Sequence, residues 1–334
     1  MKAMVLDHHV PIETAPLKLR HPPTPRPNEN QVLIKIKACG ICHTDLHIIE
    51  GEVRPPKLPI IPGHQIVGEI VEFGNAVTNR PVGERVGVPW VSSPCDNCGY
   101  CYVGEENLCD NIRFTGFDVN GGLAEYMLAP AEYVYPIPET FSDTQAAPLL
   151  CAGIIGYRAL KLSGAEKGST LGLFGFGASA HITIQLAIHQ GIKVFVYTRS
   201  ENHRQLAKEL GASWVGGADD DPPKEIDSGI IFAPAGSLIP KALRKLRKGG
   251  TLALAGIYMD KVPEMPYDLI YGERKIVSVT NSTREDAMGL LKAAAEIPIR
   301  TEVERFPLEK ANEAYLKLKR SEIRGAGVIV VSED

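Results

Sequence analysis

TLGLFGFGASA, residues 170–180, is the stretch of this sequence that decides the fold. Residues 170–174 form a short apolar run typical of a buried strand, and a helix is predicted from residue 178 to residue 190. Between them a G-x-G-x-x-G/A pattern permits a tight turn and a close approach of the backbone to a pyrophosphate. The stretch therefore predicts a dinucleotide site at a helix N-terminus, with contacts from Gly175, Gly177, Ala178, Ser179 and Ala180.

Strands and helices alternate on both sides of this stretch. Further strands are predicted over residues 193–198, 228–233 and 251–255. Further helices are predicted over residues 147–162, from Ser200 to Leu210, and over residues 239–247. Such alternation is typical of a doubly wound parallel sheet, so we expect a Rossmann domain over residues 147–284.

The second predicted strand of this domain ends in the sequence VFVYTRS. An NAD site places Asp or Glu near this point to bind the ribose 2′-hydroxyl, but Thr198 stands there, followed by Arg199 and Ser200. A missing carboxylate beside an arginine suits a 2′-phosphate, and His203 and Arg204 add positive charge one turn later. We predict NADP(H) as the preferred cofactor; the alternatives are NAD(H), or a helix start that is merely solvated.

The chain before residue 147 has a different pattern of apolar residues, proline and glycine. Short apolar runs at residues 31–38, 65–73 and 85–89 are separated by clusters of proline and glycine, which predicts a β-rich domain. The pattern becomes mixed again after about residue 285. We therefore expect an α/β protein in which residues 1–146 and 285–334 form one domain and residues 147–284 form the other.

Composition excludes several classes of protein. The chain has 334 residues, 44% hydrophobic and 23% charged, with a net charge of −4, which is typical of a globular protein. It has no long basic run, so neither nucleic acid nor an acidic membrane is an expected partner. The first residues lack a signal-peptide pattern and no run of 18 apolar residues occurs, so we expect a cytoplasmic protein.

Four of the seven cysteines crowd into PCDNCGYCYVGEENLCD. Their spacing is C-x2-C-x2-C-x7-C, formed by Cys95, Cys98, Cys101 and Cys109. Four thiolates satisfy a tetrahedral zinc ion and leave no position for a substrate, so this site is predicted to be structural. A bacterial ferredoxin cluster would need a last gap of three residues followed by proline, whereas here the gap is seven residues and Asp110 follows. Unliganded thiols are the remaining alternative.

Three separate segments supply a second possible set of zinc ligands. CGICHTDLH contains Cys42, IPGHQIVGEI contains His64, and APLLCAGIIGYRAL contains Cys151. Two cysteines and one histidine are a known ligand set for a catalytic zinc, with a fourth position open. Spacing alone does not join these residues, and each one taken singly could be an ordinary core residue.

Together these motifs resemble the zinc-containing medium-chain alcohol dehydrogenase family. GICHTDLH, PGH, the four-cysteine loop ending in GEENLC, LLCAG and LFGFGASAH occur in the order seen in that family, and the similarity covers essentially the whole chain. The resemblance implies a GroES-like β-rich catalytic domain and a Rossmann cofactor domain. It also implies a homodimer or a homotetramer.

The resemblance assigns roles to residues of the first domain. Cys42, His64 and Cys151 correspond to the ligands of a catalytic zinc, and Asp45 to a carboxylate that orients His64. By the same resemblance, Thr44 takes the substrate proton and His47 relays it, while Trp90 lines the substrate pocket. Cys39 is left over and is expected to be structural.

Two positions depart from the family pattern. The family commonly has Glu after the zinc histidine, where this chain has Gln65, which cannot place a charge behind the metal. Many relatives carry Arg after the glycine of the terminal strand, where this chain has Ala326; Arg324 is a candidate to compensate.

The function implied is reversible hydride transfer between a short primary alcohol or aldehyde and NADP(H), with two zinc ions per chain. Oxidation of polyols or secondary alcohols is the alternative within the same chemistry. A zinc- and NADP-binding protein without turnover is the alternative from another class, although a complete Thr44–His47 relay would serve no purpose there.

Overall fold

The computed structural model describes residues 1–332. These residues divide into two compact units, each described below by itself. The first unit comprises residues 1–151, 281–295 and 301–332, and the second comprises residues 152–280 and 296–300. None of the helices within residues 1–332 is long and apolar enough to cross a membrane.

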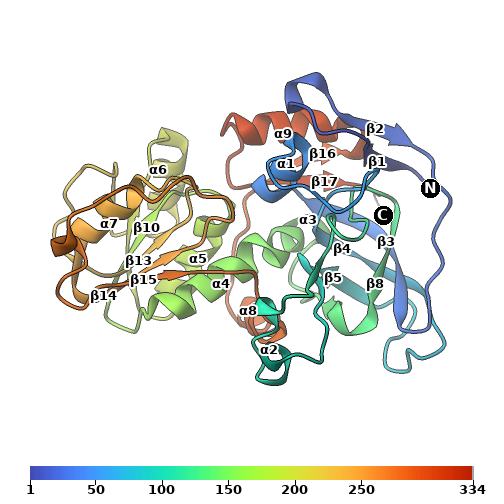
Figure 1. Cartoon of the computed structure of the whole chain (residues 1–334), viewed down its shortest axis with the longest axis horizontal. Coiled ribbons are helices and arrows are strands. Elements are labelled where there is room, and N and C mark those ends of the chain that lie inside the picture. The colour runs from blue at the N-terminus through green and yellow to red at the C-terminus, as the bar shows by residue number, and fades with distance from the viewer. Residues whose placement is uncertain (333–334) are drawn as a thin grey trace. The chain divides into compact units, whose positions relative to one another are not determined.

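The second unit is an α/β unit built on a parallel sheet that is flanked by helices (Figure 1). The strand order of this sheet is β12-β11-β10-β13-β14-β15. Numbered from β10, this order is the 3-2-1-4-5-6 order of a dinucleotide-binding fold. The strands are β10 (Thr170–Phe174), β11 (Lys193–Tyr197), β12 (Trp214–Gly216), β13 (Ile226–Ile231), β14 (Leu246–Leu254) and β15 (Lys275–Ser278).

Helices connect these strands and bury their faces. They are α4 (Ala152–Ser163), α5 (Ala178–His189), α6 (Glu201–Glu209) and α7 (Leu238–Lys245), with the 3-10 helix η5 (Tyr267–Leu269). α4 and α5 pack on each other, α4 also on β13 and β14, and α7 on β10, β13 and β14. The five residues of β10 are all buried, as expected for a central parallel strand covered on both faces.

The first unit is built on a seven-stranded sheet, β16-β17-β3-β4-β5-β9, in which β8 also pairs with β3. Two-stranded sheets β1-β2 and β6-β7 complete its β structure. The strands are β1 (Ala3–Leu6), β2 (Leu17–Arg20), β3 (Gln31–Gly40), β4 (Gln65–Phe73), β5 (Arg85–Val88), β6 (Val91–Ser93), β7 (Arg113–Phe114), β8 (Tyr126–Pro130), β9 (Tyr135–Pro136), β16 (Val303–Pro307) and β17 (Ala326–Val330).

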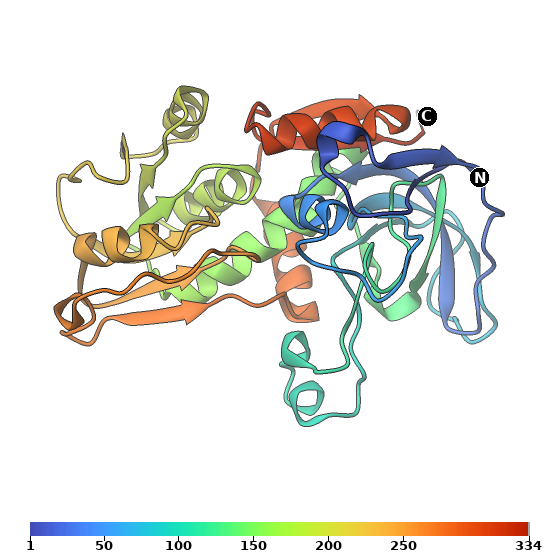
Figure 2. The same ribbon diagram turned by 45° about the horizontal axis from the view of Figure 1, so that its top comes forward.

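The helices of this unit are short, apart from α8, and lie around the sheet. They are α1 (His43–Glu50), α2 (Gly99–Tyr102), α3 (Asp143–Ala146), α8 (Arg284–Glu296) and α9 (Ala311–Lys319), with the 3-10 helices η1 (Ile12–Thr14), η2 (Glu106–Leu108), η3 (Ala131–Tyr133), η4 (Ala147–Leu150) and η6 (Leu308–Lys310). α9 packs on β16 and β17 near the C-terminus (Figure 2). A core of aliphatic side chains from β1, β3, β4, β5 and α1 fills the unit.

The GroES-like and Rossmann architecture expected from the sequence is confirmed, with one difference that bears on the site. The helix expected over residues 147–162 is two helices, η4 and α4, separated at Cys151. Cys151 has φ −134° and ψ −65°, so the helical backbone breaks there. The apolar periodicity continues across the break, which is why the sequence pattern did not reveal it.

Candidate metal centres and cofactor site

Antiparallel pairing of β3 with β4 brings two of the expected ligand segments together. The last pair in the register joins Gly40 to Gln65. Cys42 lies two residues beyond the end of β3, and His64 lies one residue before the start of β4. The two side chains therefore meet at one end of the ladder, although 21 residues separate them in the chain.

Cys151 joins this pair from the break between η4 and α4. η4 packs against β3, β4 and β5, which places its C-terminal end at the same end of the sheet. The ligand atoms of Cys42, His64 and Cys151 all lie within 4.8 Å of one another. The structure thus brings together the three residues that the family order had linked and that spacing alone could not.

The Asp45 carboxylate binds both ligand-bearing segments. Its Oδ1 accepts hydrogen bonds from His64 Nδ1 at 2.7 Å and from the Gly63 amide at 3.2 Å. Its Oδ2 accepts from the Cys42 amide at 3.1 Å, within a capping box at the start of α1. Gly63 adopts φ 98°, and a Cβ there would lie 2.8 Å from Cys39 Sγ, so glycine is required at this approach.

The electrostatics of the three residues suit a metal ion. In a neutral His64 ring, Nδ1–H donates to Asp45 and Nε2 carries the lone pair that a metal would take; Nε2 is buried and has no hydrogen-bond partner within residues 1–332. Burial disfavours a charged His64, but the Asp45 charge and hydrogen bond and the neighbouring Cys42 raise its pKa to about 10. The pKa of Cys42 is lowered, and its hydrogen bond with Cys151 is the largest cause. A dication would satisfy this donor set with two thiolates and a neutral imidazole.

The other residues expected near this centre lie around it. The Thr44 hydroxyl is 3.6 Å from Cys42 Sγ. The Trp90 ring meets the His64 ring edge-on, with centroids 4.9 Å apart. His47 Nδ1 is hydrogen-bonded to the Glu52 carboxylate, a partner that the sequence did not predict, since the only sign of it was an acidic residue five positions further on. Cys39 is fully buried outside the ligand set.

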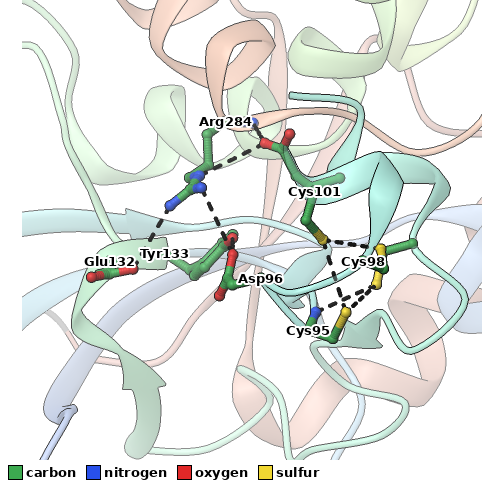
Figure 3. A network of polar contacts seen from close by, with 9 residues as sticks. Cys95, Asp96, Cys98, Cys101, Glu132, Tyr133 and Arg284 are labelled. Carbon is green, nitrogen blue, oxygen red and sulfur yellow. Dashed lines mark hydrogen bonds and ion pairs between the residues drawn. The ribbon is translucent and has the colours of Figure 1, made fainter. Parts of the chain in front are cut away.

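The four cysteines of the loop also converge. Cys95 Sγ lies 3.4 Å from Cys109 Sγ and 4.0 Å from Cys101 Sγ, and Cys98 Sγ lies 3.5 Å from Cys101 Sγ (Figure 3). A tetrahedral ion with metal–sulfur bonds of about 2.3 Å needs sulfur atoms about 3.8 Å apart, so the cluster has the right size for zinc. A backbone amide from Asn97 contributes most to lowering the pKa of Cys95 to about 7.

Arg284, the first residue of α8, anchors this four-cysteine loop (Figure 3). Its guanidinium lies 3.8 Å from Asp96, 3.7 Å from Glu106 and 3.7 Å from Glu132. It also covers the Tyr133 ring at 5.1 Å, and its backbone amide donates to Glu106 Oε1 at 2.7 Å. The sequence reasoning missed this network, because nothing local in the sequence links residues so far apart.

In the second unit, the glycine-rich turn follows β10 where the strand order reverses between β10 and β13. Gly175 adopts φ 91°, and a Cβ there would lie 2.9 Å from the Ala233 amide nitrogen. Gly177 caps α5, and a Cβ there would meet open space, which leaves room for a ligand against the backbone. Ala178 and Ser179 supply the first backbone amides of α5, and Ala180, in the first turn of the same helix, is fully buried. Ligands of such sheets bind at this reversal.

The residues expected to choose between the two cofactors stand at the end of β11. Thr198 directly follows the strand, Arg199 is exposed, and Ser200 precedes α6 without making a side-chain cap. Arg204 Nε donates to the Thr198 carbonyl at 3.0 Å, which holds its guanidinium at the strand end. His203 lies beside it on α6, half-buried.

The structure also places Gln65 and Ala326, the two residues that depart from the family pattern. Gln65 is buried at the start of β4, against Gly40. Ala326 begins β17, and Arg324 pairs with Glu302 across 3.6 Å.

Two family models match the chain. The alcohol dehydrogenase GroES-like domain matches residues 28–139, and the zinc-binding dehydrogenase model matches residues 180–296. A probable alcohol dehydrogenase AdhA of Mycobacterium tuberculosis is 43% identical over 327 residues, 96% of this chain and 94% of that protein. An alcohol dehydrogenase of Geobacillus stearothermophilus is 36% identical over 340 residues, 99% of this chain and 100% of that protein. The chain belongs to the zinc-containing medium-chain alcohol dehydrogenase family.

Solved structures agree with the architecture. Acetophenone reductase from Geotrichum candidum, in complex with NAD, is 27% identical with a TM-score of 0.89 over 99% of this chain and 97% of that one. A zinc-binding dehydrogenase of Sinorhizobium meliloti bound to NADP is 28% identical with a TM-score of 0.85 over 99% of both chains. This alcohol dehydrogenase is therefore an enzyme that uses zinc and a nicotinamide cofactor on small alcohols or aldehydes.

Proposed function

We propose that this alcohol dehydrogenase interconverts short primary alcohols and aldehydes with NADP(H). In the proposal Cys42, His64 and Cys151 hold a catalytic zinc, and the four cysteines of the loop hold a structural one. The observation that carries it is the convergence of two thiols and one buried imidazole nitrogen within 4.8 Å, since this is an open three-ligand set.

The chain's own residues would share the work around the metal. When bound, zinc polarises the substrate oxygen and the nicotinamide exchanges hydride with the substrate carbon. Asp45 holds His64 in the tautomer that presents Nε2. The Thr44 hydroxyl, next to Cys42 Sγ, would accept the proton of the substrate hydroxyl as it gives up its own, which would pass on to His47 and from there, beside the partly exposed Glu52, to water. Trp90 would narrow the space for the substrate carbon chain.

Metal analysis and turnover test the ligand assignment together. Two zinc ions per chain are expected in the wild-type protein and one in Cys42→Ser or His64→Asn, with loss of turnover in both variants. Cys39→Ala is the matched control, because Cys39 is as fully buried as His64 but stands outside the cluster, and it should keep both ions and its activity. Full turnover in His64→Asn would contradict the assignment.

The preference for NADP(H) rests on the end of β11. Thr198 offers no carboxylate to the ribose 2′-hydroxyl, and the Arg204 guanidinium is held there by the Thr198 carbonyl with Arg199 exposed beside it. A guanidinium is well suited to bind a phosphate. The acidic run at residues 219–221 counts against this preference, because it follows the neighbouring parallel strand β12 at the same edge of the sheet and would repel a phosphate. Within this run, the Asp220 carboxylate accepts a hydrogen bond from the Gly217 amide.

Comparing kcat/KM for the two cofactors decides the preference. Arg199→Ala should lower kcat/KM for NADPH by about tenfold, the loss of one charge-assisted contact, and leave NADH almost unchanged. Lys208→Ala, which removes an exposed cation from the last turn of α6, is the control and should alter neither. A wild-type enzyme that prefers NADH would refute the proposal.

Secondary alcohols are the second candidate substrates, because a structure with the same fold over nearly its whole length is an acetophenone reductase. A screen of ethanol, 1-butanol, 2-butanol and 1-phenylethanol separates the two, and kcat/KM should be highest for the primary alcohols. We further propose a homodimer or homotetramer, which light scattering on the purified enzyme will distinguish.

A further inference from the structure

Asn281 stands just before α8 with its backbone in the left-handed region, at φ 50°. Asn is one of the few residues besides glycine that adopt this conformation readily. Both ends of its side-chain amide are bonded. Oδ1 accepts a hydrogen bond from Trp90 Nε1 at 3.2 Å, and Nδ2 donates one to the Asn107 carbonyl at 3.2 Å.

The first of these bonds fixes a ring that touches a candidate metal ligand. Trp90 stacks on Phe114 with centroids 4.6 Å apart and planes 12° from parallel, and the tilted ring of Phe117 lies beside both, 6.0 Å from Trp90 and 6.4 Å from Phe114. Its contact with His64 is edge-on. Stacking sets the tilt of an indole but lets it slide and turn in its own plane. The bond from Nε1 to Asn281 removes that freedom.

The second bond joins Asn281 to the four-cysteine loop. Asn107 is buried in η2, two residues before Cys109. The segment after Asn281 is held to the same loop a second time, because the Arg284 amide donates to Glu106. Asn281 is thus held by hydrogen bonds to two residues, Trp90 and Asn107, that are themselves packed in place.

We infer that Asn281 is a positioning residue that holds the Trp90 indole against His64 and links the four-cysteine loop to the Cys42–His64–Cys151 cluster. Its kinetic consequence rests on the proposed function, in which Trp90 narrows the space for the substrate. Fixing the indole then favours short alcohols over bulky ones, through KM more than through kcat.

Fluorescence tests the link without any need for turnover. Trp90 and Trp214 are the two tryptophans of the chain, so a Trp214→Phe background leaves Trp90 as the reporter. Asn281→Gly keeps the backbone conformation available and removes both bonds. Asn281→Asp keeps the oxygen that accepts from Trp90 and removes the donor to Asn107.

In this background, Asn281→Gly should shift the Trp90 emission to the red and increase its quenching by acrylamide, whereas Asn281→Asp should keep the parent emission. The same emission in all three proteins, or the same change in both variants, would overturn the inference. Should Asn281→Gly fold poorly, Trp90→Phe removes the same hydrogen bond and leaves residue 281 untouched, and the kinetic comparison below, which needs no tryptophan reporter, then tests the inference.

Kinetics on the zinc-loaded enzyme tests the consequence. Asn281→Gly should lower the ratio of kcat/KM for ethanol to that for benzyl alcohol by about fivefold to tenfold, with kcat for ethanol little changed. Trp90→Phe should lower the same ratio, and the double variant should be no worse than Trp90→Phe alone. An unchanged ratio in Trp90→Phe, or additive effects, would overturn the inference. A wild-type enzyme that oxidises neither alcohol would refute the proposed function, and the fluorescence result would then decide the inference alone.

Discussion

Replacing Asp45 by Asn should weaken both the fold and the candidate catalytic metal centre. The carboxylate is fully buried and accepts three hydrogen bonds, from the amides of Cys42 and Gly63 and from His64 Nδ1. Asn has one acceptor oxygen, so its NH2 group must face at least one of these donors. Losing one partner of a buried charged pair costs about 3–5 kcal/mol, and we expect a loss of stability in that range. Zinc affinity should fall about 10–100-fold, the usual effect of losing the carboxylate behind a metal-bound histidine.

Two measurements separate these effects. Urea unfolding of the metal-stripped protein reports the hydrogen bonds alone, and competition with a chelating dye reports the metal. Asp286→Asn is the matched control, because Asp286 is also fully buried and accepts bonds from the amide and hydroxyl of Thr283 at 3.0 Å. That control should lose stability but keep its zinc affinity. A stripped Asp45→Asn protein within about 1 kcal/mol of wild type would refute the reasoning, since one such bond alone contributes more.

Three further changes have calculable outcomes. Arg284→Met should lower the free energy of unfolding by about 2 kcal/mol and speed zinc loss from the four-cysteine loop. The control Arg20→Met breaks one exposed ion pair with Asp7 and should lower that free energy by less than about 1 kcal/mol. Equal losses of stability for the two variants in urea unfolding would contradict the role of the Arg284 network. Gly175→Ala should weaken dinucleotide binding at least about tenfold in calorimetry, because its φ of 91° and the Ala233 backbone leave no room for a methyl group; an unchanged Kd would refute this. Burial raises the pKa of Tyr197, whose hydroxyl has no hydrogen-bond partner within residues 1–332, so the folded state keeps its proton while the unfolded chain releases it above about pH 10. Stability should therefore fall as pH rises past 10, and Tyr197→Phe should be as stable at pH 7 and lose less at pH 10.5 in thermal melts; equal alkaline losses would contradict this.

Local pattern was enough for the elements that depend on local chemistry. The strands over residues 65–73 and 170–174 have the bounds that their apolar runs indicated, because each run is terminated by glycine or proline or by a change of polarity. The helix over residues 147–162 failed at Cys151, where packing of η4 on the sheet overrides an unbroken helical pattern. Family order supplied the association of Cys42, His64 and Cys151, and no periodicity could have supplied it.

The contacts of Arg284 and Asn281 could not be predicted from local sequence patterns. The Arg284 amide and the Glu106 carboxylate are 178 residues apart in the chain, and Trp90 and Asn281 are 191 residues apart. A sequence pattern reports spacing along one element, whereas these pairs are fixed by the return of α8 to the four-cysteine loop. The one local sign was the residue type at 281, since Asn tolerates the positive φ that this turn requires.

The three candidate ligands share a placement that explains why periodicity did not find them. Cys42 lies between β3 and α1, His64 immediately before β4, and Cys151 in the break before α4. At each position the chain leaves one regular element before it enters the next, so the side chain is free of the alternation that would turn it into the core or out to water. A metal cluster needs donors that point to one spot from different directions, and element ends supply such directions where strand interiors do not. Asp45 then makes the arrangement rigid, because its two oxygens bind the Cys42 and Gly63 backbone together with the His64 ring.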